Sequence, residues 1–403
     1  MTALGIALLV LGVGGAITRP RGLPAWSVPS VLAVVAVVAG VLHGPTHALR
    51  PLASPIAFLF AAVPLAVLLD RLGFFSSAAE VLGKGRHLAL GLWVLGALVT
   101  TVLNLDASVV LLTPLYVRIA QRRGLDVVSL AFQPVLLSCL ASSALPVSNL
   151  TNLIAASDHR LRTGSFVAHL ALPSLAATIV GWFVYRRVLP PGEPTSGPPQ
   201  QIEQPAAERP AGEQQVVDRR ALVVGALVVA GVLVGFVIGS GVGVPEWAVA
   251  LGADVVLVAI VRVVPWRDVP WGTGLVAASL GLLAAGAASH LDLVHVFSGG
   301  GNLDLVRVAL VSAVGANLVN NLPALLVALP STGQGIWALL LGVNIGPMVL
   351  VTGTLAALLW QSSLGRLTVH IDARTFARVG ARVMLPSFAA AIIVLLVLRP
   401  LTG

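Results

Sequence analysis

The sequence predicts an all-α, polytopic membrane protein with about ten transmembrane helices and two opposed re-entrant hairpins, built as an inverted repeat. Three observations lead to this fold class. The 403 residues are 57% hydrophobic and only 10% charged, whereas soluble proteins carry about 25% charged residues. Apolar runs close to the roughly 20 residues needed to span a bilayer recur along the whole chain. Polar residues interrupt these runs at matching places in the two halves.

The apolar runs define the elements in chain order. Backbone N–H and C=O groups find no water inside a bilayer, so each run is expected to be helical. No basic residue precedes the first run and no small-x-small site ends it, so it is not expected to be a cleaved signal peptide. The runs are 1–18, 28–42, 54–72, 88–117, 164–185, 221–244, 247–264, 273–289, 305–330, 335–360 and 383–398.

Residues 190–218 have a different composition, which divides the chain. They are rich in Pro, Gln and Glu and almost lack large apolar side chains. Such a segment cannot bury enough apolar surface to fold and is typical of a disordered linker. The predicted organisation is therefore a first membrane repeat at 1–189, a disordered cytoplasmic linker at 190–218 and a second membrane repeat at 219–403.

The basic residues predict the topology, because Lys and Arg gather in cytoplasmic loops. With the N-terminus outside, residues 88–121 must enter the membrane and return, since about 34 residues would form a helix of roughly 50 Å. A second hairpin, 303–331, then enters from the opposite side. Of 24 Lys and Arg, 19 fall inside. This explains the net charge of +8 without a nucleic-acid partner. The five outside are Arg50, Arg160, Arg162, Arg307 and Arg399.

An internal repeat relates the two halves. When the second half is laid over the first, Asn104–Pro114 aligns without gaps with Asn320–Pro330, and each segment begins with Asn and ends with Pro. A second polar interruption follows at 146–152 in the first half and at 344–354 in the second. Interrupted helices at matching places indicate a binding site near the bilayer midplane, into which half-helix ends direct partial charges. The alternative is a set of packing kinks, which Gly and Pro commonly make in membrane helices.

The interrupted segments resemble those of the arsenite/antimonite efflux permeases of the ion transporter superfamily, in register from about residue 5 to the C-terminus. The resemblance implies an inner-membrane secondary transporter that expels trivalent metalloid in exchange for protons by an elevator-like movement of the hairpin domain. Sodium/proton antiporters and citrate or dicarboxylate carriers of the same superfamily are the alternatives. The matching segments are Pro20–Leu23, Leu69–Phe75, Ser148–Ser157, Asn320–Pro323 and Gly346–Trp360.

The chain departs from the permease pattern at two breaks. The first hairpin tip reads Asn-Leu-Asp-Ala at 104–107, where the permeases have Ala-Asn-Asp-Gly. In the last broken helix, Asn344 stands in place of an acid, Met348 in place of a Lys, and Leu350-Val351 in place of Thr-Pro. The acid of the first tip is thus retained, and two charges of the pattern are absent.

Asp106 is the acid at the first tip, and we predict that it couples transport to protons. An ionisable group inside a membrane is a functional candidate by default, because its charged form is costly there. A carboxyl group that loses its hydration takes up a proton more readily, so Asp106 is expected to load and release one near neutral pH. The alternative is an acid kept neutral, or paired with a helix end, for structural reasons.

Uncharged polar residues at the breaks are the predicted substrate-binding set. Arsenous acid near neutral pH is an uncharged trihydroxide, and amides and hydroxyls can both donate to and accept from its OH groups. A dicarboxylate would need cationic or helix-end support, and no Lys or Arg is predicted there. The alternative for each residue is a cap or an interhelix bond. The set is Asn104, Ser108, Ser148, Asn149, Thr151, Asn152, Asn320, Asn321, Asn344, Thr352 and Thr354.

Other chemistry-bearing residues are interpreted as structural. Cys139 is the only cysteine and is expected to be inert packing. Asp254 lies eight residues before Arg262, so the two are expected on one helix face; a coupling role for Asp254 is the alternative. His43/His47 and His290/His295 do not make a convincing metal site.

These patterns exclude several classes. The chain lacks the glycine-rich Lys-Ser/Thr motif that holds ATP phosphates. A lipid-modifying enzyme would need its polar cluster at the membrane interface instead of at mid-depth. We therefore predict a multi-pass transporter of the cell membrane, not an enzyme, without cofactor or metal. Its partners are the lipid bilayer and a small-molecule or ion substrate; a homodimer and a separate soluble ATPase subunit remain open alternatives.

Overall fold

The computed structural model describes the chain except for residues 1, 83–86, 160, 191–217, 290 and 403. The predicted linker therefore lies outside the described residues, apart from its two end residues. The same holds for Lys84, Arg86, Arg160 and Arg209, which the predicted topology used. Every regular element in the described part is helical, so the all-α fold class is confirmed.

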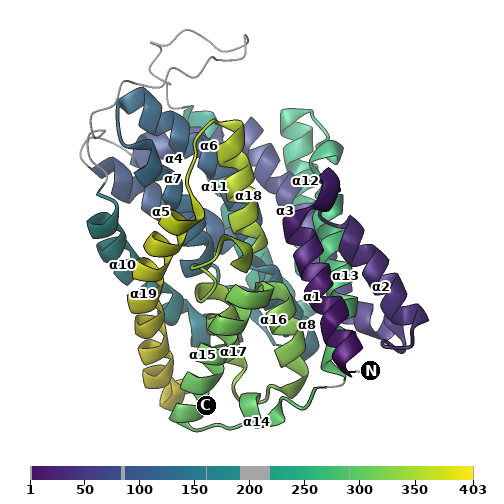
Figure 1. The fold of residues 1–403 in the computed structure, drawn as a ribbon. Coiled ribbons are helices and arrows are strands. Elements are labelled where there is room, and N and C mark those ends of the chain that lie inside the picture. The colour runs from purple at the N-terminus through teal and green to yellow at the C-terminus, as the bar shows by residue number, and fades with distance from the viewer. Residues whose placement is uncertain (1, 83–86, 160, 191–217, 290, 403) are drawn as a thin grey trace.

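The first half runs from a peripheral helix pair to a cluster of broken helices (Figure 1). A long α3 carries three internal prolines and connects the two parts. The elements are α1 (Thr2–Thr18), η1 (Pro20–Gly22), α2 (Ser27–Val38), α3 (Pro45–Arg71), α4 (Phe74–Leu82), α5 (Leu88–Val102), α6 (Leu105–Arg123), α7 (Val127–Leu140), η3 (Pro146–Ser148), α8 (Leu150–His159), α9 (Thr163–Phe166), η4 (Val167–Ala171) and α10 (Leu172–Val188).

The second half repeats this order of long helices, hairpin and broken helix. Its last helix, α19, begins ten residues before the predicted run 383–398, because an Arg-bearing segment extends the helix beyond its apolar part. The elements are α11 (Arg219–Val242), α12 (Glu246–Val261), η5 (Trp266–Asp268), α13 (Trp271–Ala288), α14 (Val294–Phe297), α15 (Asn302–Val319), α16 (Asn321–Ala328), η6 (Leu329–Ser331), α17 (Ile336–Ile345), η7 (Val351–Gly353), α18 (Leu355–Arg366) and α19 (Ala373–Thr402).

Six helical spans among the described residues are long and apolar enough to cross a membrane. Several other apolar helices are shorter; α1, for example, has 17 residues, or about 25 Å, against a hydrocarbon core of about 30 Å. The polytopic class is therefore established, and the figure of ten crossings stays a prediction. The six spans are Pro45–Arg71, Thr163–Val188, Arg219–Phe236, Trp266–Ala288, Asn302–Val319 and Ala373–Pro400.

Two helical hairpins occupy opposite halves of the molecule. In Figure 1, α5, α6 and α7 lie in the upper half and α15, α16 and α17 in the lower half. In each hairpin one arm is shorter than a hydrocarbon core of about 30 Å: α5 has 15 residues and α16 only eight, about 22 Å and 12 Å. The other arms, α6 and α15, have 19 and 18 residues. The predicted hairpins 88–121 and 303–331 are present, and they open toward opposite ends of the molecule.

Each hairpin is followed by a helix that breaks in the middle. In the first half, this helix consists of two half-helices, α7 and α8, separated by residues 141–149. In the second half, residues 346–354 separate α17 from α18. Each break contains a single 3-10 turn, η3 or η7, and a single capping residue, Asn149 or Thr354, stands between this turn and the next half-helix. The two breaks are therefore built alike.

Contacts between the halves bury large aromatic side chains. The Trp360 indole N–H donates to the Ala131 carbonyl at 2.7 Å, and the Phe132 ring lies 5.1 Å from the Trp360 ring. Aromatic pairs of this kind add stability beyond the area that they bury.

One prediction for the second half is wrong. Arg262 adopts φ 58° as the residue that ends α12, so it does not continue the helix face of Asp254.

Candidate functional site

A small pocket lies where the two hairpins and the two broken helices meet. Its lining comes from the first residues of four helices, α6, α8, α16 and α18, and from the residue just before α8. Two of these helices belong to each half of the chain. The lining residues are Leu105, Asp106, Asn149, Leu150, Thr151, Asn321, Leu322 and Leu355.

The N-terminal ends of all four helices therefore face one point. A helix N-terminus carries unpaired N–H groups and a partial positive charge. In each of the four, the side chain of the residue before the helix accepts a bond from one of these N–H groups. The bonds run from the backbone N of Asp106 to Asn104 at 2.8 Å, of Thr151 to Asn149 at 3.1 Å, of Leu322 to Asn320 at 3.3 Å and of Ala357 to Thr354 at 3.0 Å.

Asp106 is the only ionisable group among the described residues that line this pocket. It stands in the first turn of α6, where a helix end favours negative charge. Its side chain is 7% exposed, and its Oδ1 has no hydrogen-bond partner within the described part of the chain. A buried oxygen without a partner is costly. Asp106 therefore presents an open acceptor to whatever enters the pocket.

Asn321 brings a free amide from the second half. It is the first residue of α16, 6% exposed, and its side chain makes no hydrogen bond with the residues that the structure describes. An amide offers two donor hydrogens and an acceptor oxygen. Asp106 and Asn321 are thus the two lining residues whose polar groups are not committed to the protein.

Asn344 stands behind the pocket and connects the two breaks. Its Oδ1 accepts from Asn149 Nδ2 at 2.9 Å and from Thr151 Oγ1 at 2.8 Å. Its Nδ2 donates to Asn152 Oδ1 at 2.7 Å and to Ser143 Oγ at 3.3 Å. The buried amide uses its donors and its acceptor on four residues of the first half. Asn344 therefore positions lining residues and does not itself line the pocket.

Each hairpin is tied to the break of its own half. Thr101 Oγ1 donates to the Ala141 carbonyl at 2.9 Å, where α7 ends. Asn317 Nδ2 donates to the Gly346 carbonyl at 2.8 Å, where α17 ends. The register that lays the first hairpin tip over the second also lays Thr101 over Asn317. Sequence reasoning missed both residues, although that register would have paired them.

Two predicted site residues make further ties of this kind. Ser148 Oγ donates to the Thr101 carbonyl at 2.6 Å, and Asn320 Nδ2 donates to the Thr352 carbonyl at 2.9 Å. Asn152 donates from Nδ2 to the Ser142 and Leu145 carbonyls. Each bond satisfies a backbone carbonyl that the end of α5 or an unwound break leaves without a helical partner. These side chains support the unwound backbone.

The structure therefore divides the predicted site residues into groups. Asp106, Asn149, Thr151 and Asn321 line the pocket. Asn104, Asn320 and Thr354 act as helix caps, the alternative that the sequence left open. Ser108 bonds to Thr100 inside the first hairpin. The others brace the breaks, except Thr352, which contributes only its carbonyl through the Asn320 bond. The bracing residues are Ser148, Asn152 and Asn344.

The described residues offer neither a thiol at the pocket nor a cluster of metal ligands. Cys139 is buried in α7 and does not line the pocket. Among the described residues, no three His, Cys, Asp or Glu side chains gather as a metal site would require. The polar groups that line this pocket are oxygen and nitrogen groups and helix ends.

An all-helical membrane protein whose paired broken helices open onto one central pocket is a secondary transporter in its architecture. The comparisons with known proteins agree. The chain belongs to the citrate transporter family, whose sequence model matches residues 6–334. It is 28% identical to an arsenical pump membrane protein of Yersinia enterocolitica and 27% identical to one of Escherichia coli K12. Each alignment covers 94% of this chain and 95% of the relative.

Proposed function

We propose that this protein is a proton-coupled transporter that exports arsenite, antimonite or a similar neutral metalloid hydroxide. The observation that carries the proposal is a pocket with one unpartnered carboxyl and one free amide, in a chain aligned over 94% of its length with arsenical pump membrane proteins. The protein would reside in the cell membrane with residues 190–218 on the cytoplasmic side.

The chemistry of the ligand fits the groups that the pocket leaves free. Each OH of a metalloid trihydroxide donates one hydrogen bond and accepts others. Asp106 Oδ1 can accept, the Asn321 amide can do both, and Thr151 Oγ1 keeps an open lone pair after it donates to Asn344. Leucines complete the lining and exclude water from unused faces of the ligand.

Exchange follows if proton and substrate compete for the same carboxyl. The ionised Asp106 accepts hydrogen bonds from two hydroxyl groups, whereas a protonated carboxyl loses part of that acceptor capacity. Loading a proton from one side then favours release of the metalloid on that side. The return of Asp106 with its proton and the outward passage of substrate become alternate halves of one cycle.

The Asn344 bonds bear on how the pocket moves. They join α17 and its break to α8, so the lining from both halves is held as one unit. A rigid unit that carries the whole pocket can change its access by moving against α1–α3 and α11–α13, which is the elevator type of alternating access. A homodimer or a soluble ATPase partner stays a separate prediction.

An organic-anion carrier is the second candidate, and two observations favour it. The matching family is described as a citrate transporter family. Four helix N-termini face the pocket, and helix N-termini bind carboxylates without any Lys or Arg. Against it, Asp106 would repel an anion unless it carried a proton.

Transport into inside-out membrane vesicles distinguishes the candidates. We expect an imposed pH gradient, acid inside, to drive arsenite uptake in the wild-type protein and to leave citrate outside. The Asp106→Asn variant is expected to lose at least about 100-fold of the gradient-driven rate, because an amide side chain cannot take up and release a proton as a carboxyl does. The Asp292→Asn variant, which changes an exposed loop carboxyl, is the matched control and should retain the rate.

Three outcomes would contradict the proposal. Citrate or sodium movement without arsenite movement would assign the second candidate or a sodium/proton antiporter. Gradient-driven arsenite uptake by Asp106→Asn would remove the carboxyl from coupling. Arsenite uptake that requires ATP and not the gradient would point to a pump subunit with a soluble ATPase.

A further inference from the structure

We propose that the junction of α10 and α19 binds an anionic phospholipid, with the headgroup on a group of arginines and the acyl chains along the two helices. No member of this arginine group lines the pocket, and the proposal does not depend on the proposed transport function. Its members are Arg186 and Arg187 at the end of α10 and Arg374, Arg378 and Arg382 in the first turns of α19.

The three arginines of α19 form one exposed basic line. They are spaced four residues apart, which places them on one face of the helix, and all three are exposed. Basic residues at a helix N-terminus face its partial positive charge, which is unfavourable without an anion. The carboxyl that acts on Arg374 and Arg378 is that of Asp372, fully exposed and already bonded to the Thr375 backbone N–H.

The end of α10 places Arg186 and Arg187 at the same membrane surface as the arginines of α19. The two helices run side by side in opposite directions (Figure 1). They meet closely at Gly181, where an added Cβ would lie 3.3 Å from Ser387 Oγ. Five residues, or about 7.5 Å, separate Gly181 from Arg186 and Ser387 from Arg382. Because the helices are antiparallel, both steps lead toward the same membrane surface.

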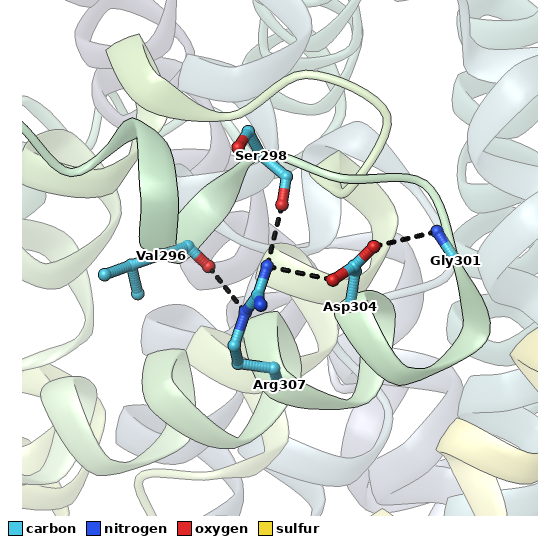
Figure 2. Close-up of polar contacts among 5 residues, drawn as sticks. All are labelled: Val296, Ser298, Gly301, Asp304 and Arg307. Atoms are coloured by element: carbon cyan, nitrogen blue, oxygen red, sulfur yellow. Dashed lines mark hydrogen bonds and ion pairs between the residues drawn. The ribbon is translucent and has the colours of Figure 1, made fainter.

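None of the five arginines forms an ion pair within the described part of the chain; the ion pairs there involve other residues. Arg186 lies over the Phe183 ring at 4.9 Å, a contact that leaves its N–H groups free. A contrasting case is Arg307, whose guanidinium donates to the Val296 and Ser298 carbonyls and pairs with Asp304 (Figure 2). The arginine group at α10 and α19 therefore has unused donors.

Two apolar lines lead away from the arginine group into the membrane. On α10, the exposed residues before Arg186 are apolar, and on α19 the exposed residues between Arg382 and Arg399 are apolar as well. These side chains are between 45% and 67% exposed, so the protein itself does not cover them. They are Leu172, Leu175, Ile179 and Phe183 on α10 and Leu385, Ile393 and Val397 on α19.

A phospholipid matches this combination of features. Guanidinium groups bind phosphate through paired N–H donors, and the two apolar lines continue from the headgroup position in the direction of acyl chains. A free phosphate or an acidic soluble partner would use the arginines and leave the apolar lines without a role. Basic clusters beside a membrane helix are also typical of anionic-lipid binding.

Lipid retention by the purified full chain tests the proposal. Native mass spectrometry would compare phosphatidylglycerol with phosphatidylcholine on wild type, on Arg378→Gln/Arg382→Gln and on Arg19→Gln/Arg21→Gln. The last pair removes two exposed arginines from η1, away from α10 and α19, and is the matched control. Each membrane-surface arginine contributes about fivefold in affinity, so we expect about 25-fold weaker phosphatidylglycerol retention in the first variant and less than twofold change in the control.

Other results would overturn the proposal. An equal loss in both double variants would assign the attraction to net charge alone. Equal retention of the two lipids by wild type would remove the headgroup from recognition. Displacement of phosphatidylglycerol by millimolar inorganic phosphate would assign the arginines to a soluble anion. If Arg378→Gln/Arg382→Gln does not yield a monodisperse protein, Arg186→Gln/Arg187→Gln tests the same group from α10.

Discussion

The amide of Asn344 makes four hydrogen bonds that no other residue type can reproduce in full. An ionised carboxyl at this position accepts but cannot donate. It would keep the bonds from Asn149 and Thr151, and the Ser143 hydroxyl could turn to donate to it, but it would face Asn152 Oδ1 without a hydrogen between the two oxygens. This explains, in physical terms, why an amide and not an acid suits the network in this chain.

We predict that Asn344→Asp destabilises the protein by about 1–3 kcal/mol, the usual cost of leaving buried polar groups unpaired. The measurement is thermal unfolding in detergent followed by tryptophan fluorescence. Asn302→Asp is the control, because Asn302 is exposed and its Oδ1 accepts from Arg399, a role that a carboxylate keeps. Equal melting temperatures for wild type and Asn344→Asp would show that the network does not depend on the amide donors.

At the scale of elements, the close packing of α19 against the second break is decisive for the shape of the site. The break at 346–354 has unwound backbone, which must be packed or bonded inside the protein. A Cβ added at Gly380 of α19 would collide with the Met348 carbonyl oxygen. Because the colliding atom belongs to the backbone, no side-chain rotation can relieve the clash. Gly380 thus lets the helix approach the break.

We therefore expect Gly380→Ala to reduce the yield of folded, monodisperse protein severely and to lower the melting temperature of what remains. Size-exclusion chromatography of the detergent extract measures both the yield and, after heating, the stability. Gly14→Ala in α1 is the matched control, since a Cβ there meets nothing within 4 Å and alanine is the better helix former. Normal yield and stability of Gly380→Ala would mean that α19 can shift away from the break at little cost.

On the scale of the whole molecule, the two halves depend on each other. The pocket needs residues from both, Asn344 bonds to the first break, and Trp360 bonds to Ala131. Buried contacts of this kind stabilise an assembly without any covalent connection between its parts. The function of residues 191–217 as a connection is therefore separable from the structure of the site.

We predict that a protease site inserted between Pro199 and Gln200 can be cut without separating the halves. The cut protein should elute as one species, and its gradient-driven transport in vesicles should stay within about twofold of the uncut protein. A second protease site inserted between Gly333 and Gln334, beside the second hairpin, serves as the contrasting cut and should abolish transport. Dissociation of the halves after the first cut would show that the buried contacts are insufficient.

Much of the site was open to prediction because polar residues are rare in this chain. Asn104 and Asn320 at the two hairpin tips, and the acid Asp106, stand out from apolar surroundings. A single alignment register between the two halves pairs the hairpins. That register does not hold for the breaks, because the helix after the first tip is longer than the one after the second by several residues. One register therefore could not reveal that Thr354 is the counterpart of Asn149.

By itself, the sequence determined the all-helical membrane fold, the opposed hairpins and the acid at the first hairpin tip. Each of these depends on composition, on periodicity or on a polar residue within lipid, and all are local properties of the chain. Only the tertiary structure decided which amides line the pocket and which only cap a helix or brace a break. A capping residue and a pocket-lining residue can be of the same type and differ only in what surrounds the side chain. Those surroundings depend on four helix ends, far apart in the sequence, that meet at one pocket.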